Sequence, residues 1–264
     1  MNGAARVQPV TPPTGPAAAA ALSIHAMTSS GAAWALFTRL GEAQILLPAM
    51  AAALLWLLRT PSTRPLAGAW LLSTALAAAI TTVSKVAFIG WALGYAPLDY
   101  TGISGHAMFS AAVLPVLARI AAGRAPRPWP RVLIAAGFLL AAGVAVSRVP
   151  TGAHSPFEVV LGFLLGGAAS AWALRRTQAP EAPTPGWLAV ALLAWMLVLP
   201  FGAQPSRTHD LVTELSLRVS GRGLPYTRHE LHRQAWLKQR GIASGGSAGR
   251  APAAQVQLQP VSQR

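Results

Sequence analysis

The chain has 264 residues, of which 53% are apolar and only 11% are charged, whereas about a quarter of the residues in an average soluble domain are charged. Together with a mean hydropathy of +0.45, this composition excludes an ordinary soluble globular protein. The chain contains no cysteine, which excludes thiol catalysis, disulfide bonds and cysteine-ligated metals. Its net charge of +14 lies mostly in short loops and in the C-terminal tail. We interpret this charge as a signal of membrane orientation, with no nucleic-acid partner expected.

The chain begins with a polar lead, and six apolar blocks follow it. Residues 1–33 are rich in Ala, Pro, Ser and Thr and lack apolar periodicity, which predicts a disordered N-terminal lead. Six apolar blocks of about 17–25 residues follow, long enough to cross a bilayer. They cover residues 34–58, 66–91, 103–122, 132–147, 156–174 and 186–202. Short connections make neighbouring helices antiparallel, so we expect an all-α integral membrane protein with a six-helix bundle over residues 34–202.

Two local patterns add detail to this expectation. In the fifth block, Gly162 and Gly166 have the GxxxG spacing that allows another helix to approach closely. Residues 203–240 predict a basic amphipathic tail with one short helix over 208–219 and a second helix opened by a capping box of Thr227 and Glu230. Such a helix beside a bilayer usually lies on anionic headgroups. Residues 241–264 are expected to be disordered.

The basic residues of the loops predict the orientation of the bundle. The loops on one side carry eight arginines, namely Arg59, Arg64, Arg119, Arg124, Arg127, Arg131, Arg175 and Arg176. The opposite loops carry only Lys85 and Arg148. The positive-inside rule therefore places the arginine-rich side in the cytoplasm. Six crossings then put the basic tail outside, against the sign of its own charge, although long tails count less in this rule.

Polar residues that a membrane should not contain gather at the ends of the apolar blocks. In chain order these are Lys85, Ser104, Gly105, His106, Arg148, His154 and Glu158. Taken singly, Lys85 is better explained as a snorkelling lysine, and each histidine as a satisfied interfacial residue. Because neighbouring helices are antiparallel, however, all seven are expected at one membrane face. Two helix N-termini also meet there, and their free N–H groups favour an anion, so the pattern predicts a phosphate site.

At these residues the sequence resembles the type 2 phosphatidic acid phosphatase superfamily, whose pattern is K-x6-R-P, then P-S-G-H, then S-R-x5-H-x3-D. Ser104-Gly105-His106 matches the second motif with Ile103 in place of proline, and Ser147-Arg148-x5-His154-x3-Glu158 matches the third with Glu in place of Asp. The first motif is weak, because Ala92 stands where the family has arginine after Lys85. The resemblance covers roughly residues 34–175.

The resemblance implies a phosphohistidine mechanism without a metal or other cofactor. His154 is the expected nucleophile, Glu158 the carboxylate that orients its ring, and His106 the general acid. The expected phosphate-binding residues are Lys85, Ser104, Gly105 and Arg148. Glu158 has a competing structural role, because Ser155 and Glu158 also form a capping box. Asp99 and Tyr100, in the short loop before Ser104, could help to bind the leaving group, but a solvated turn residue and an interfacial aromatic are the more common explanations.

We therefore expect a multi-pass phosphatase of the bacterial inner membrane whose active site faces the periplasm. Its expected partners are membrane lipids and a lipid phosphate substrate, with undecaprenyl diphosphate favoured and phosphatidate or phosphatidylglycerophosphate next. The sequence leaves the oligomeric state open. The alternative, favoured by the missing arginine, is a protein that keeps the phosphatase fold but binds or moves a lipid phosphate without hydrolysis. Vanadate-type haloperoxidase chemistry belongs to soluble enzymes, and the six apolar blocks argue against it.

Overall fold

The protein is described from a computed structural model that defines residues 34–35, 37–123, 125–126, 128–175, 186–202 and 208–241. The predictions of disorder for residues 1–33 and 241–264 lie outside these described residues, apart from Gly241, which lies in the turn after the last helix. Within them the secondary structure is helical apart from turns and one isolated β-bridge between Tyr95 and Tyr100. The all-α prediction is confirmed.

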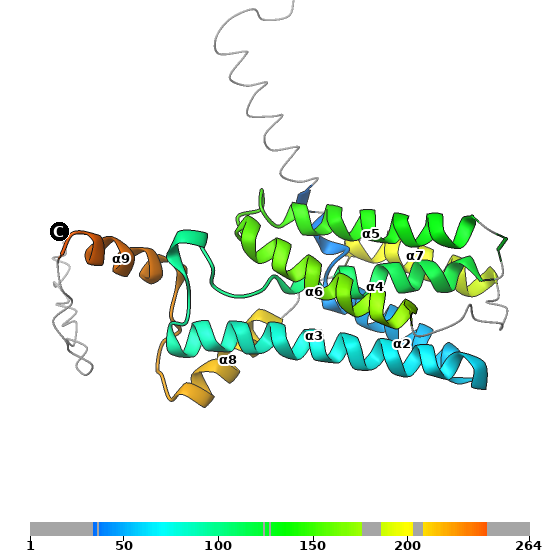
Figure 1. Cartoon of the computed structure of the whole chain (residues 1–264), viewed down its shortest axis with the longest axis horizontal. Helices are drawn as coiled ribbons and strands as arrows, with labels where there is room; N and C mark the ends of the chain where they lie inside the picture. Colours follow the sequence, from blue (N-terminus) through cyan, green and yellow to red (C-terminus); the bar gives the residue numbers. More distant parts are fainter. Residues whose placement is uncertain are drawn as a thin grey trace, which may run out of the picture.

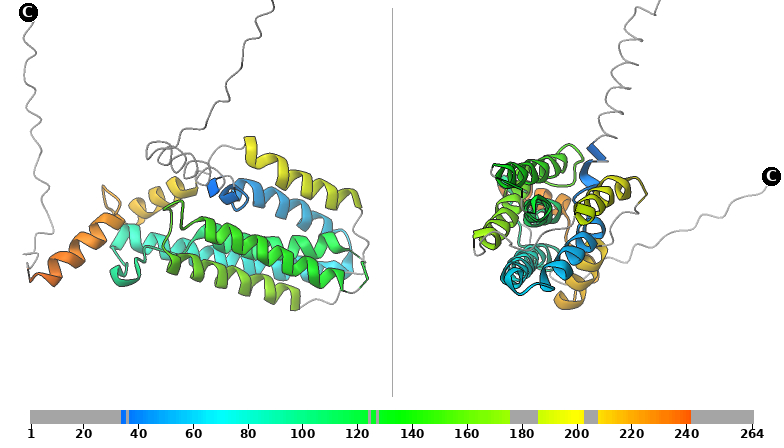
Figure 2. Two further views of the ribbon diagram at one scale, coloured as in Figure 1. Left: turned by 90° about the horizontal axis from the view of Figure 1, so that it is seen from above. Right: turned by 90° about the vertical axis from the view of Figure 1, so that its right-hand side faces the viewer.

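Six apolar helices lie side by side in one bundle (Figure 1, Figure 2). They are α2 (Ala43–Leu58), α3 (Arg64–Trp91), α4 (Gly105–Ala122), α5 (Trp129–Ser147), α6 (Pro156–Arg175) and α7 (Gly186–Gly202). The 3₁₀ helices η1 (Pro61–Thr63) and η2 (Ala96–Leu98) lie in the connections before and after α3. Helix α4 contacts α2, α3, α5, α6 and α7, and 78% of its residues are buried. The bundle is therefore organised around α4, which carries the Ser-Gly-His motif at its N-terminus.

The close approach of α6 to α4 depends on two glycines. A Cβ atom on Gly162 would lie 2.5 Å from the carbonyl oxygen of Ser104, and a Cβ on Gly166 would overlap the carbonyl group of Met108. The small-residue surface predicted on the fifth apolar block therefore forms a close helix contact, and the helix that it contacts is α4. This contact holds the N-termini of the two helices, and the residues they carry, at one end of the bundle.

The apolar helices differ in length. The segments Pro61–Trp91, Gly105–Ala122, Trp129–Ser147 and Pro156–Arg175 are long and apolar enough to cross a membrane. The 16 residues of α2 correspond to about 24 Å at 1.5 Å per residue, which is less than the roughly 30 Å of a hydrocarbon core. Helix α7 has 17 residues. By length and composition, four of the described helices can therefore cross a membrane, and the count of six crossings stays a prediction.

The prediction of one continuous helix over residues 34–58 is wrong. A break at residues 40–42 precedes α2, and Glu42 has extended backbone angles as its N-cap. Gly41 in this break lies against Val144 of α5 and His106 of α4, and a Cβ atom there would overlap Val144. The chain therefore passes over the end of α4 before α2 begins.

The C-terminal helices α8 (Thr208–Ser220) and α9 (Arg228–Gln239) lie at the end of the bundle where α3 ends and α4 begins (Figure 1). Helix α8 packs against α3, where a Cβ on Gly90 would lie 3.0 Å from the Cβ of Ser220. The capping box of Thr227 and Glu230 at the start of α9 is confirmed. The tail is thus folded onto the bundle, which the sequence did not indicate.

Helix α8 also has an apolar side that faces away from α3. It consists of Leu211, Leu215 and Val219, which are all exposed. An apolar stripe of this kind fits a helix at the boundary of a bilayer. Contact of the tail with lipid headgroups therefore stays a prediction, alongside its observed contact with α3.

Candidate active site

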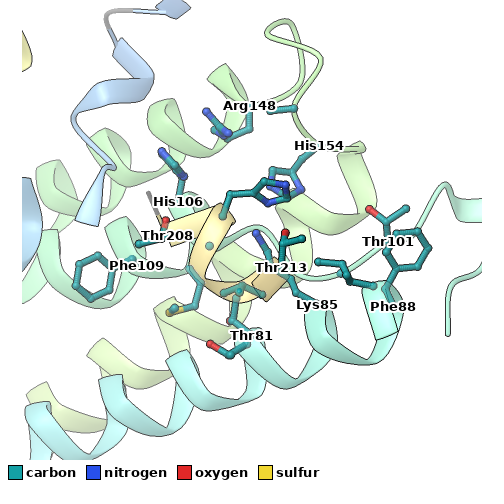
Figure 3. A pocket seen from close by; sticks show the side chains of 18 of the residues that line it. Thr81, Lys85, Phe88, Thr101, His106, Phe109, Arg148, His154, Thr208 and Thr213 are labelled. Atoms are coloured by element: carbon teal, nitrogen blue, oxygen red, sulfur yellow. The ribbon is translucent and has the colours of Figure 1, made fainter. Parts of the chain in front are cut away.

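A cavity of about 850 Å³ opens at the end of the bundle that carries the predicted motifs. Five of the seven predicted residues line it, namely Lys85, Gly105, His106, Arg148 and His154. Lys85 comes from α3, Gly105 and His106 open α4, Arg148 caps the C-terminus of α5, and His154 lies just before α6. Figure 3 shows the side chains of Lys85, His106, Arg148 and His154 grouped around the same space.

His154 and Glu158 form a hydrogen-bonded pair. The Nδ1 atom of His154 lies 2.7 Å from Oε2 of Glu158, whose side chain is fully buried. The same Oε2 accepts from the backbone N–H of Ser155 at 3.1 Å, and the N–H of Glu158 donates to the Ser155 hydroxyl at 3.3 Å. The capping box and the contact with the imidazole therefore coexist, and Glu158 occupies both of the roles that compete in the sequence.

The second oxygen of Glu158 and one further cation complete its surroundings. Oε1 accepts from the backbone N–H of Thr101 at 2.5 Å and from the Thr101 hydroxyl at 2.6 Å. Arg228 of α9 donates from Nη2 to Oε2 at 2.8 Å. Sequence reasoning missed both residues. Thr101 lies three residues before Ser104 and could have been found by its position, but Arg228 lies 70 residues after Glu158, and the capping box around it indicates only the start of a helix.

The electrostatics favour a neutral imidazole at His154. Burial lowers the pKa of His154, and the hydrogen bond that its ring donates to Glu158 opposes this effect. A neutral ring that donates from Nδ1 to Glu158 has its lone pair on Nε2. That tautomer leaves Nε2 as the nitrogen available to a ligand in the cavity.

Arg148 has a donor that is ready for an anion. Its Nη1 donates to the Thr38 hydroxyl at 2.8 Å, which fixes the guanidinium. Its Nε is buried and, within the described residues, has no hydrogen-bond partner. Such an unpaired donor is costly unless a ligand or water satisfies it. The arrangement suits a bound phosphate oxygen.

Two predicted residues, Ser104 and Glu158, do not line the cavity. Ser104 is fully buried as the N-cap of α4, its backbone N–H donates to the Glu158 carbonyl at 3.1 Å, and its hydroxyl has no partner among the described residues. Glu158 lies behind His154. The role of Ser104 as a phosphate ligand stays a prediction, whereas Gly105 has open space around it, with nothing within 4 Å of a Cβ placed there.

The residues around the weak first motif have structural roles. Ala92, at the position of the family's arginine, is the left-handed C-cap of α3 with φ of 60°. Asp99 is a partly exposed turn residue, as expected, but its carboxylate also pairs with Arg228 and accepts from Nε2 of His232 at 2.6 Å. The tail supplies both partners, which is why the local sequence did not indicate them.

The cavity offers cations and imidazoles rather than a metal-ligand set. In the described ranges, no three His, Cys, Asp or Glu side chains lie close enough together to hold a metal ion. Besides the carboxylate of Glu42, the charged and imidazole groups that line the cavity are the ammonium of Lys85, the guanidinium groups of Arg148 and Arg228, and the imidazoles of His106, His154 and His209. These groups bind phosphate oxygens, accept or donate protons, and can attack phosphorus.

The fold and the cavity together define a helical integral membrane protein with a site suited to a phosphate group. Residues 66–181 match the model of the PAP2 superfamily. A relative from Klebsiella pneumoniae, described as an uncharacterized 22.5 kDa protein in the cps region, is 38% identical over 207 residues, which cover 77% of this chain and 99% of the relative. The chain belongs to the PAP2 superfamily, whose members are phosphatases of lipid phosphates. No solved structure matches it significantly.

The segment matched by the family model ends before the tail. It contains all seven predicted site residues and Thr101, whereas α8 and α9 begin after residue 181. Arg228 is therefore a site residue that the family pattern does not include.

Proposed function

We propose that the protein hydrolyses a lipid pyrophosphate at the outer face of the bacterial inner membrane, with undecaprenyl diphosphate as the favoured substrate, through a phosphohistidine at His154. The observation that carries the proposal is the composition of the cavity wall. Its polar end holds the cations and imidazoles, and it continues along apolar residues, namely Leu47, Ala78, Met108 and Phe109. Leu47 is 52% exposed on the side of α2, so this end reaches the lateral surface. A substrate with a phosphate head and a lipid tail fits both ends.

In the first step, the Nε2 lone pair of His154 attacks phosphorus in line. A P–N bond forms as the P–O bond to the leaving group breaks, and the positive charge on the ring is stabilised by Glu158 through Nδ1–H. His106 gives a proton to the departing oxygen as general acid. For a pyrophosphate the leaving group is the lipid monophosphate.

In the second step, water attacks the phosphohistidine. His106, now deprotonated, accepts a proton from this water, the P–N bond breaks, and inorganic phosphate leaves with His154 again neutral. Lys85, Arg148 and the Gly105 N–H are positioned to hold the phosphoryl oxygens as charge builds up in both transition states.

The number of cations supports a pyrophosphate over a monoester. Lys85 and Arg148 line the cavity beside Gly105 at the N-terminus of α4. A pyrophosphate head carries more charge and more oxygens than a monoester, so it makes fuller use of these two cations and the backbone donors than phosphatidate or phosphatidylglycerophosphate does. The preference among these lipids rests on this charge argument and on the substrates of the family.

The test is phosphate release by the purified protein from a panel of undecaprenyl diphosphate, phosphatidate and phosphatidylglycerophosphate. We expect release from undecaprenyl diphosphate to be fastest and a phosphoenzyme to be trapped by acid quench. His154→Ala should abolish both, whereas His229→Ala, which removes an exposed imidazole of α9, should change neither. Binding of these lipids without release would instead support the non-hydrolytic alternative, and full turnover by His154→Ala would refute the phosphohistidine.

A further inference from the structure

We propose that Arg228 is a positioning residue of this active site: its guanidinium holds the Glu158 carboxylate against His154, so that the C-terminal segment completes the catalytic unit. The inference rests on the proposed function of His154 and extends it to a part of the chain outside the matched family segment.

The contacts of Arg228 reach three groups at once. Nη2 donates to Oε2 of Glu158 at 2.8 Å and to the Thr101 hydroxyl at 2.9 Å. Nη1 donates to the carboxylate of Asp99 and to its backbone carbonyl at 3.1 Å. The planar fork of a guanidinium can make these bonds together, which an ammonium cannot do. Arg228 thus ties the loop before α4 to the first turn of α6.

The position of Arg228 is fixed by folded contacts on both sides of it. The backbone N–H of Tyr226 donates to the carbonyl of Ile89 at 3.0 Å, and the buried Tyr226 ring packs edge-on against Phe88 with 5.4 Å between ring centroids. On the other side, Nε2 of His232 lies 2.6 Å from Asp99. These contacts hold Arg228 at the site, where it also lines the cavity.

Arg228 and His154 share one carboxylate oxygen, Oε2 of Glu158. A fully buried carboxylate is costly unless charges and donors compensate it. The charged and titratable groups that face the His154–Glu158 pair are Lys85 of α3, His106 of α4, Arg148 after α5 and Arg228 of α9. In the described part of the chain, two charged or titratable side chains pair with the Glu158 carboxylate, namely His154 and Arg228. Arg228 is therefore the permanent cation in direct contact with it.

This geometry predicts opposite effects for two substitutions. Without Arg228, the uncompensated charge of Glu158 stabilises the protonated imidazole of His154, so the acid limb of the rate profile moves to higher pH. Without the charge of Glu158, the protonated imidazole loses its partner, so the limb moves to lower pH. A tail that only stabilised the fold would produce neither shift.

The experiment compares Arg228→Gln, Arg228→Lys and the control Arg218→Gln in the full-length protein. Arg218 is also on the tail but is exposed and pairs with Glu214. We expect Arg228→Gln to lower kcat by about 10²-fold, the size of loss that misplacement of a catalytic group causes, with little change in KM and an acid limb at higher pH. Arg228→Lys should keep the limb close to that of the wild type with part of the kcat, and Arg218→Gln should match the wild type.

Two further measurements separate this inference from the proposed function. In a Glu158→Gln background, Arg228→Gln should add almost no further loss, because both act through one contact. An NMR titration of the His154 ring in the unliganded protein should show its pKa raised by Arg228→Gln and lowered by Glu158→Gln, whether or not a substrate has been found.

An unchanged His154 titration and an unchanged kcat in folded Arg228→Gln would overturn the inference, as would full additivity with Glu158→Gln. A rise in KM with kcat and the acid limb unchanged would also overturn it, because Arg228 would then be a substrate ligand. The proposed function fails on a different result, namely no phosphate release and no phosphoenzyme in the wild type.

Discussion

At the scale of single residues, Glu158 has both a structural role, as a cap of α6, and a proposed catalytic role, as the partner of His154. Its two oxygens accept hydrogen bonds from His154, Ser155, Thr101 and Arg228. A side chain that caps a helix and orients an imidazole at the same time couples the start of α6 to the position of the ring. The fold and the candidate catalytic pair therefore depend on the same carboxylate.

Glu158→Gln separates the proposed catalytic role of Glu158 from its capping role. The amide keeps an acceptor for the cap but loses the charge that stabilises the imidazolium, so we expect phosphate release to fall by about 10²-fold or more, in the range of acid–base groups. Glu158→Asp keeps the charge and should retain more activity than the amide. Rates are measured together with thermal unfolding in detergent. A lower melting temperature with intact turnover would show that capping is the whole role of Glu158.

The pH dependence follows from the surroundings of His154. Burial lowers its pKa from the usual 6.5, and the neutral ring is the nucleophilic form. Activity should therefore persist at pH 6.5 and be lost only as the pH falls through the lowered pKa. The unfolded chain takes up a proton on this ring at higher pH than the folded chain, so the contribution of His154 to stability also decreases as the pH falls below 6.5. Phosphoenzyme formation measured across pH checks this, and an acid limb above 6.5 would contradict it.

At the scale of elements, the contact between α4 and α6 sets the site. Helix α4 presents His106 and helix α6 presents Glu158, and the backbones can approach only because Gly162 and Gly166 lack side chains. Two helix N-termini are thereby held together beside the cavity. The distance between the proposed nucleophile and general acid is thus a property of this helix pair.

Gly166→Ala tests this contact. Its Cβ would overlap the Met108 carbonyl group, so α6 must move away from α4, and we expect a loss of about 1–3 kcal/mol or more in stability, as for other overpacked cores, together with reduced turnover. The matched control is Gly167→Ala, whose Cβ would make an ordinary contact of 3.7 Å with Phe138. Melting temperatures in detergent compare the two variants. Equal melting temperatures of the two variants would show that the contact between α4 and α6 can accommodate a methyl group at position 166.

At the scale of the whole molecule, the structure separates two ends. The cavity, α8 and α9 lie at one end of the bundle, and η1, between α2 and α3, lies at the other (Figure 1). The basic tail thus shares an end with the proposed phosphate site, as six crossings would require. The arginine-rich loops predict that the opposite end is cytoplasmic.

Single cysteines in this cysteine-free chain test the orientation. Leu98→Cys places an exposed thiol in η2 near the cavity, and Ser62→Cys places one in η1 at the opposite end. On intact spheroplasts, a membrane-impermeant thiol reagent should label position 98 and leave position 62 protected until the membrane is permeabilised. The reverse pattern would place the active site in the cytoplasm and remove an outer-face substrate from the proposal.

The sequence alone determined the features that depend on neighbours along the chain. Apolar blocks, the capping boxes at Ser155 and Thr227, and the positions of His106 and His154 at helix starts follow from local patterns, because helix ends are set by backbone groups a few residues apart. Antiparallel connection then brings the polar ends to one face. This reasoning placed five of the seven predicted residues in one cavity.

Only the tertiary structure decided the features that depend on distant parts of the chain. The pairing of Arg228 with Glu158 joins residues 70 positions apart, and the docking of α8 on α3 depends on the missing side chain of Gly90. The break at Gly41, before α2, lies where Val144 and His106 pack against the backbone, with no room for a side chain. Each of these features depends on which surfaces are complementary in three dimensions. A local pattern of residues does not indicate which side chain of a distant helix will pack against it.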